Sequence, residues 1–236
     1  MLTELYQYAI RHELVARPGF KPKRPKAYVQ LTLNGEFIGL SLCEKNAPPA
    51  MAPDIGAAAQ GTKACNPLIE KAGICLRIVA DEIRDQNIAV KHQFFREFFN
   101  QGKMAEPLFA AVETALSAEA VLETIRRDLA AQNLKASDPV GFAVDGLRLD
   151  QSNRYWDWWD TYRRQYIKSS DNDEARCLIT GTLTQAMPTI PKVSGLISVG
   201  GHSSGDAFLC FDKDAFQSYD LDKKIGRASC RERVLM

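Results

Sequence analysis

The sequence feature that most constrains the fold is a pair of alternating apolar runs, YVQLTL and EFIGLSL, on either side of Asn34 and Gly35. Alternation of apolar and polar residues is typical of strands with one buried face. Asn-Gly favours a type I′ turn, because both central residues of that turn need positive φ. The pattern therefore predicts a β-hairpin over residues 27–43, with Asn34 and Gly35 at the centre of its turn.

Helical spacing of apolar residues predicts most of the other regular structure. Ser117 is expected as an N-cap and Pro67 in a first helical turn, positions that suit these residue types. Residues 44–64 are rich in Ala, Pro and Gly, so we expect a long loop there. Helices are expected over residues 2–16, 67–80, 88–100, 117–131 and 151–168.

Short apolar segments after Pro139 predict strands, including a second hairpin through VGFAVDGLRL. Together these predictions give an α+β fold with an N-terminal helix and β-hairpin, a helical middle, and short antiparallel strands towards the C-terminus. We expect one α+β domain over residues 1–224, with a helical insertion at about 66–131.

Aromatic residues are concentrated in two of the expected helices. The phenylalanines of QFFREFF share one broad stripe and are expected in the core. The tryptophans of RYWDWWD are expected to pack on several sides of their helix, with Asp157 and Asp160 paired to Arg163 or Arg164. A tryptophan that stacks on a nucleobase is the alternative.

Composition places the chain among ordinary globular proteins, with 45% hydrophobic and 25% charged residues and a net charge of +1. No run approaches ~18 consecutive apolar residues, so we expect no membrane span and a cytoplasmic location. The cysteines and histidines do not stand at metal-ligand spacings, so we expect reduced thiols and neither metal nor cofactor. Phosphate-loop, nucleophile-elbow, zinc-protease and dinucleotide motifs are absent from the sequence, so we do not expect an enzyme.

Positive charge is concentrated in RPGFKPKRPK, near the N-terminus. Lys21, Lys23, Arg24 and Lys26 lie there on a stiff segment punctuated by prolines, which suits contact with a phosphate backbone. The alternative is a solvated connection between two elements.

A second candidate is the glycine-flanked loop GGHSSG. His202, Ser203 and Ser204 lie in this loop, whose backbone N–H groups and hydroxyls suit phosphate or base contacts. A plain structural turn is the alternative. Adjacent His and Ser in a sequence do not make a catalytic triad.

The last residues, IGRASCRERVLM from Ile225, differ from the rest of the chain. Their first ten residues resemble the translation of a common sequencing adapter. We therefore expect residues 225–236 to be a non-native tail, to be left out of functional argument, and the protein to be truncated.

The segment from Ala175 to Asp220 carries a family resemblance. ARCLITG, TIPKVSGL and GGHSSGDAFLCFDKDAFQSYD occur in the order and at about the spacing found in the large subunit of the type I-C CRISPR surveillance complex (Cascade). Matching positions include Cys177, Gly181 and Tyr219. The chain resembles the N-terminal part of that subunit.

The resemblance implies a non-catalytic subunit of a crRNA-guided antiviral complex. Such a subunit binds crRNA and double-stranded target DNA and helps to recognise the protospacer-adjacent motif. Its partners are the handle-binding and backbone subunits and a recruited helicase-nuclease. The nucleic-acid contacts that follow are Lys21, Lys23, Arg24, Lys26, Lys192, His202, Ser203 and Ser204. Two alternatives stay open, a metal-dependent nuclease and a pure assembly scaffold.

Overall fold

The computed structural model describes residues 19–78 and 82–166 almost completely. Outside these ranges it describes residues 4, 7, 8, 11, 17, 174–176, 183–185 and 197–202. The chain divides into one unit over Gly19–Ile167 and a second formed by Met1–Pro18 with Lys168–Met236. The predicted single domain over 1–224 stays a prediction.

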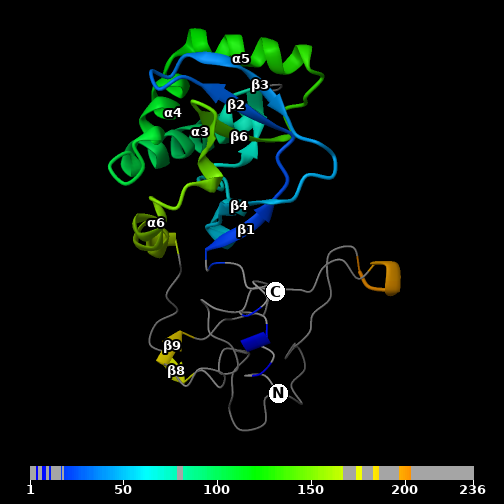
Figure 1. Cartoon of the computed structure of the whole chain (residues 1–236), viewed down its shortest axis with the longest axis vertical. Helices are drawn as coiled ribbons and strands as arrows, with labels where there is room; N and C mark the ends of the chain where they lie inside the picture. The colour runs from blue at the N-terminus through cyan, green and yellow to red at the C-terminus, as the bar shows by residue number, and fades with distance from the viewer. Residues whose placement is uncertain are drawn as a thin grey trace. The chain divides into compact units, whose positions relative to one another are not determined.

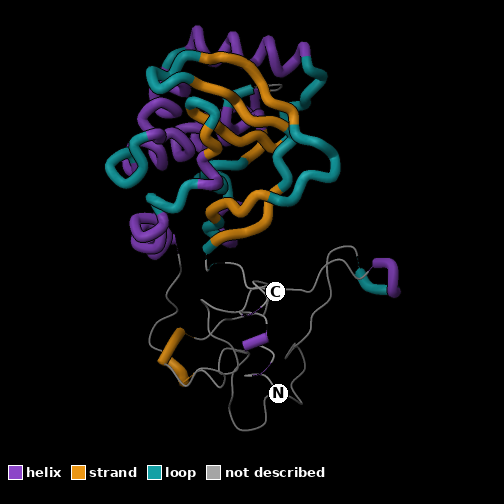
Figure 2. Tube along the Cα trace, viewed as in Figure 1, coloured by secondary structure: helices purple, strands orange, loops and turns teal. Residues whose placement is uncertain are grey.

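A mixed β-sheet forms the centre of the unit Gly19–Ile167 (Figures 1 and 2). Its two central strands, β2 (Ala27–Leu31) and β6 (Pro139–Val144), run parallel, with Val29 opposite Phe142. Within the described residues the order is β3-β2-β6-β5, and β7 also pairs with β6. The outer strands, all antiparallel to their neighbours, are β3 (Phe37–Leu42), β5 (Glu70–Lys71) and β7 (Leu147–Arg148).

The predicted hairpin is confirmed as β2 and β3, but its turn is not the predicted one. Gly35 donates to the Thr32 carbonyl (3.0 Å), so Leu33 and Asn34 are the central residues, and only Gly35 has positive φ (81°). This is a tight turn followed by a glycine bulge. A Cβ at Gly35 would lie 2.8 Å from the Ala111 carbonyl oxygen, so glycine also permits close packing on a helix.

The second predicted hairpin is also confirmed, as β6 and β7. Asp145 and Gly146 join these strands, and their φ values are 51° and 78°. This is the pair of positive φ angles that a type I′ turn requires. The described structure therefore has this backbone geometry at Asp-Gly rather than at Asn-Gly.

Between β5 and β6 the described sequence has a short helix, α2 (Ala72–Cys75), and then three longer ones: α3 (Glu82–Gly102), α4 (Leu108–Ser117) and α5 (Glu119–Ala131). Figure 1 shows α3 and α4 together beside the sheet and α5 next to β3. The helices predicted over 88–100 and 117–131 are confirmed as parts of α3 and α5. Ser117 is not an N-cap, because it ends α4 and donates from its hydroxyl to the Glu113 carbonyl (2.7 Å).

Two predictions between residues 44 and 80 are wrong in extent. The expected loop contains strand β4 (Ala50–Pro53) and a 3-10 helix, η1 (Gly56–Gln60). The helix expected from Pro67 is only α2 (Ala72–Cys75). Leu68 has φ of 62°, a left-handed conformation that an α-helix cannot contain, so a helix cannot begin at Pro67.

Aromatic rings from three helices pack together in the core, and we call them the aromatic cluster. Phe98 of α3 is fully buried at its centre. Its ring centroid lies 5.2–5.9 Å from those of Phe99, Phe109, Trp158, Trp159 and Tyr162. The predicted core role of the phenylalanine stripe and of the tryptophans is therefore confirmed.

The predicted tryptophan-rich helix is shorter than expected. It comprises α6 (Trp156–Tyr162) and a 3-10 turn, η3 (Arg163–Tyr166), preceded by another 3-10 turn, η2 (Leu149–Gln151). The Arg163 side chain lies 3.4 Å from the Asp160 carboxylate, as the sequence predicted for this pair.

A charged pair covers the face of the sheet opposite the aromatic cluster. The Arg148 guanidinium carbon lies 4.2 Å from the centroid of the Tyr28 ring, and the Nη2 nitrogen of the same group donates a hydrogen bond to the Tyr28 hydroxyl. The same guanidinium binds the Asp150 carboxylate at 2.6 Å, and the Asp150 side chain is only 3% exposed. Burial, followed by the nearby Asp150 charge, raises the pKa of Tyr28, so its hydroxyl stays protonated.

The second unit contributes short elements. Its strands β8 (Glu174–Arg176) and β9 (Leu183–Gln185) are antiparallel, and η4 (Ile197–Val199) is a single 3-10 turn. Within the predicted N-terminal helix, Glu4, Gln7, Tyr8 and Arg11 are helical, and the rest lies outside the described residues. The predicted α+β class is confirmed. No helix among the described residues is long and apolar enough to span a membrane.

Replacing Phe98 by Ala tests the aromatic cluster. The change leaves a cavity where five aromatic rings meet, so we expect the free energy of unfolding to fall by about 3–5 kcal/mol. Val90→Ala is the matched control, because Val90 lies on the same helix and is 45% exposed, and a loss of about 0.5 kcal/mol is expected there. Urea denaturation measures both. Equal losses in the two variants would contradict a core centred on Phe98.

Candidate functional site

Strand β1 (Phe20–Lys23) carries half of the predicted basic segment and is fixed by its first residue. The Phe20 side chain is buried, with its ring centroid 5.9 Å from that of Trp156 and 6.4 Å from that of Trp159. Successive side chains of a strand point to opposite faces. Burial of Phe20 therefore turns Lys21 and Lys23 together to the other face.

Pairing with β4 places those two lysines beside a loop region far along the chain. Lys21 lies opposite Ala52 and Lys23 opposite Ala50 in an antiparallel pair. The Gly19 carbonyl extends this pairing by accepting from the Asp54 backbone N–H (2.8 Å), and it also accepts from the Trp159 indole N–H (3.1 Å). The aromatic cluster thus holds β1 and β4 in place.

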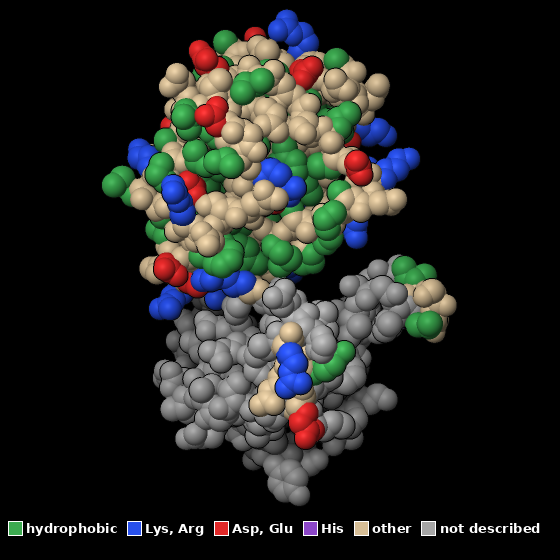
Figure 3. Space-filling view, in the orientation of Figure 1, with side chains coloured by type: hydrophobic (Ala, Val, Ile, Leu, Met, Phe, Trp, Pro, Cys, Tyr) green, Lys and Arg blue, Asp and Glu red, His purple; other side chains and the backbone are tan. Residues whose placement is uncertain are grey.

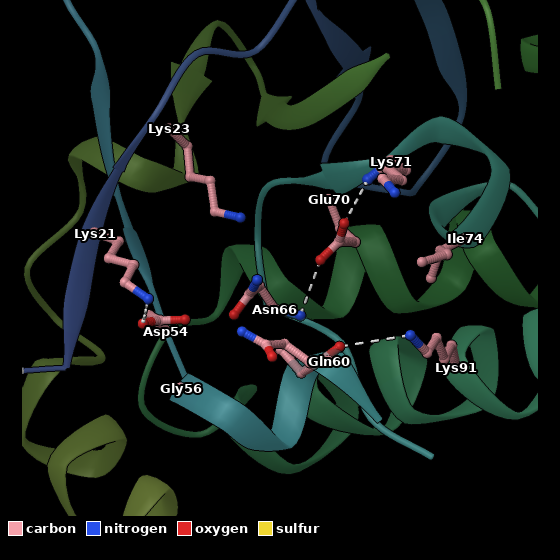
Figure 4. A pocket seen from close by; sticks show the side chains of 11 residues that line it. Lys21, Lys23, Asp54, Gly56, Gln60, Asn66, Glu70, Lys71, Ile74 and Lys91 are labelled. Atoms are coloured by element: carbon pink, nitrogen blue, oxygen red, sulfur yellow. Dashed lines mark hydrogen bonds and ion pairs between the residues drawn. The ribbon is translucent and has the colours of Figure 1, made fainter. Parts of the chain in front are cut away.

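The two lysines open into a cavity of about 350 Å³ (Figure 4). Its walls come from β1, η1, the segment between η1 and α2, α2 itself, and α3. The lining residues are Lys21, Lys23, Asp54, Gly56, Ala59, Gln60, Asn66, Glu70, Lys71, Ile74 and Lys91. We call this space the lysine cavity.

On the β1 wall, the ammonium groups are held by polar side chains. Lys21 forms an ion pair with Asp54 at 2.7 Å. With the amide nitrogen of Asn66 donating to Asp54 (2.8 Å), the amide oxygen of the same side chain accepts from the Lys23 ammonium at 3.1 Å. Asn66 thus connects the two lysines through Asp54 and fixes where both charges lie.

On the opposite wall, backbone groups organise the charges. The Glu70 carboxylate accepts from the backbone N–H groups of Asn66 (3.1 Å) and Lys71 (3.0 Å), which closes the turn before α2. The Lys91 ammonium, from α3, donates to the Ala59 carbonyl at 3.5 Å. Figure 4 shows Lys91 and Lys23 extending toward the cavity from opposite sides.

Buried thiols and an imidazole support these walls from behind. The Cys65 thiol donates to the Lys91 carbonyl (3.5 Å) and the Cys75 thiol to the Glu70 carbonyl (3.5 Å). Burial raises the pKa of both thiols, which keeps them protonated. His92 is 6% exposed, bonds the Ile74 carbonyl through Nδ1 (3.0 Å), and has its pKa lowered by burial, so its ring is neutral. These residues are structural, as predicted for buried thiols.

The lysine cavity is positively charged. Within residues 19–78 and 82–166, four lysines and two carboxylates line it, so two positive charges are in excess. On the face of the molecule that Figure 3 shows, the coloured Lys and Arg side chains are scattered among apolar and acidic ones. Converging ammonium groups bind phosphate and other anions. Where the chain is described, no three His, Cys, Asp or Glu side chains are placed to hold a metal ion.

The structure separates the predicted contact residues. Lys21 and Lys23 line the lysine cavity, whereas Arg24 and Lys26 lie just beyond β1 with exposed side chains. Arg24 donates to the Ala47 carbonyl at 3.4 Å. His202 is exposed in the second unit. Lys192, Ser203 and Ser204 lie outside the described residues, and a binding role for any of the predicted residues stays a prediction.

Two lining lysines were not predicted from the sequence. Lys71 and Lys91 are isolated cations in segments without a recognisable motif. Only the folding of α2 and α3 against the segment from η1 brings them to the same cavity as Lys21. The sequence feature that comes nearest to indicating this cavity is Asn66-Pro67, a dipeptide that favours a turn.

Replacing Trp159 by Phe tests the anchoring of β1. The variant keeps an aromatic ring but loses the donor to Gly19, at a cost of about 1 kcal/mol. We expect backbone amides of β1 and β4 to exchange hydrogen about fivefold faster, measured by mass spectrometry. Trp158→Phe is the matched control, because Trp158 belongs to the same cluster without binding Gly19. Equal exchange in the two variants would contradict the anchoring role.

Comparison with known proteins gives a family for the chain. The model of a CRISPR-associated protein family, Cas_Csd1, matches residues 2–230. The match extends past Lys224, and the expectation of a non-native tail stays a prediction. No curated protein shows a significant match to the chain. Because the family model covers nearly the whole chain, the protein belongs to the Cas_Csd1 family of CRISPR-associated proteins.

Proposed function

We propose that this protein is a nucleic-acid-binding subunit of a type I-C crRNA-guided complex, acting in the cytoplasm as its large subunit. It binds crRNA and double-stranded target DNA beside the handle-binding and backbone subunits, and it helps to recognise the protospacer-adjacent motif before a helicase-nuclease is recruited. Membership of a CRISPR-associated family supports this proposal. The observation that carries it is the lysine cavity, with two positive charges in excess.

The charge of the cavity suits the phosphate backbone better than it suits a sequence-specific contact. In guide-directed complexes base pairing supplies the sequence, while the protein reads a short motif, shape and backbone charge. Lys21 and Lys23 present their charges from a strand held by Phe20 and paired with β4. Fixed ammonium groups lose less side-chain entropy on binding than free ones do.

The subunit performs this role without catalysis. The carboxylates at the cavity are engaged in structure, Asp54 with Lys21 and Glu70 with two backbone N–H groups. A metal-dependent nuclease would need carboxylates that point at a shared metal ion. Lysine ammonium groups suit phosphate binding, but they do not hold a metal ion as carboxylates do.

Neutralising two lysines tests the DNA contact. The slope of log affinity against log salt is negative, and each phosphate contact contributes ~0.9 to its magnitude. In the reconstituted complex, Lys21→Gln with Lys23→Gln is expected to reduce that magnitude by about 1.8. Filter binding with labelled target duplex measures it. The matched control is Lys103→Gln with Arg127→Gln, two exposed cations away from the cavity, which should leave the slope unchanged. An unchanged slope in the first variant would favour the scaffold alternative.

Incubation with labelled DNA and Mg²⁺ or Mn²⁺ tests the absence of catalysis. We expect no cleavage by the purified chain, because neither cavity carboxylate is free to hold a metal ion. Asp54→Asn and Glu70→Gln are the diagnostic variants. Cleavage by the wild-type chain that either variant abolishes would establish a nuclease and contradict the proposal.

A further inference from the structure

The lysine cavity is larger than a phosphate contact needs. Its volume is about 350 Å³. Sites for small organic ligands begin at about 300 Å³. A lysine that only neutralises a duplex backbone works on an open surface, and it needs no cavity behind it. The volume therefore indicates that more than one phosphate group enters.

The lining between the lysines suits a nucleobase. Gln60 is exposed at the cavity, and no residue that the structure describes accepts or donates a hydrogen bond at its side-chain amide. An amide offers one acceptor and two donor hydrogens, which matches the hydrogen-bonding edges of bases. Ile74 is half-buried and supplies an apolar wall for the flat face of a ring. Asn66 is engaged by Lys23 and Asp54, so it positions charges instead.

The size of the cavity also limits the ligand. One nucleotide can enter it, whereas a base pair together with its stacked neighbours is too large. Proteins that bind a single base in a pocket take it out of the helical stack, at a cost of a few kcal/mol that is smallest for a base already unpaired. A duplex that is being opened for guide pairing presents such bases.

Resting on the proposed function, we propose that the lysine cavity binds one unpaired nucleotide of the nucleic acid. Its phosphate lies among the ammonium groups of Lys21, Lys23 and Lys91. Its base contacts the Gln60 amide and packs against Ile74. The site thus distinguishes opened from paired nucleic acid, which backbone charge alone does not.

Two labelled duplexes that differ by one unpaired nucleotide test the proposal. The reconstituted complex is expected to bind the duplex with the unpaired nucleotide about tenfold more tightly, equivalent to ~1.4 kcal/mol. Gln60→Leu is expected to remove most of that preference, so that the ratio of the two affinities falls toward one. Gln132→Leu is the matched control, because Gln132 is exposed and follows the end of α5, and it should change neither affinity.

The outcomes separate this inference from the proposed function. In one outcome the wild type binds both duplexes equally while Lys21→Gln with Lys23→Gln still reduces the salt dependence of DNA binding. That result overturns the nucleotide site and leaves the DNA contact standing. A Gln60→Leu variant that weakens both duplexes equally overturns the base contact. If Lys21→Gln with Lys23→Gln leaves the salt dependence of DNA binding unchanged, the proposed function itself is overturned. Displacement of the DNA by micromolar nucleoside monophosphate would identify a free nucleotide as the ligand and overturn the inference.

Discussion

The packing of Phe20 against the aromatic cluster is the interaction on which the lysine cavity depends. Burial of this ring against Trp156 and Trp159 fixes one face of β1, and strand alternation then places Lys21 and Lys23 on the other. The Gly19 carbonyl accepts from Trp159 and from the Asp54 backbone, so the same contact sets the β4 side of the cavity. Two lysines of a basic, proline-punctuated segment thus become a fixed pair of charges.

The sequence predicts elements whose signals are local. Asn34-Gly35 marks a hairpin and the stripe through Phe98 marks a core helix, because each of these patterns is contained within a few consecutive residues. The turn at Gly35 differs from the expected type because its glycine also packs against Ala111, a contact that local sequence does not contain. Helix α4 has no charged residue in its first turn to mark its start, and so it was missed.

The candidate site is less predictable than the fold because it is assembled from distant segments. Lys21 meets Asp54 through the β1–β4 pairing, and Lys91 arrives on a helix that begins after the cavity-forming loops. Neither Lys91 nor Lys71 has a neighbour in sequence that indicates its role. The concentration of cations in RPGFKPKRPK predicted a charged surface but not which of its members share a cavity. Lys21 and Lys23 share one face of β1, whereas Arg24 and Lys26 lie beyond the end of the strand at Lys23.

The carboxylates explain how four lysines can share one cavity before any ligand binds. Like charges this close repel, and Asp54 and Glu70 offset part of that repulsion. A phosphate that enters must compete with Asp54 for Lys21 but finds Lys91 held only by a weak bond to a carbonyl (3.5 Å). The phosphate affinity that the proposed function expects of the cavity is therefore a difference between two sets of ion pairs. Lys23 and Lys91 would contribute more to it than Lys21, which is already paired with Asp54. The aromatic cluster contributes by holding the strand and helix that carry these two lysines at a fixed separation.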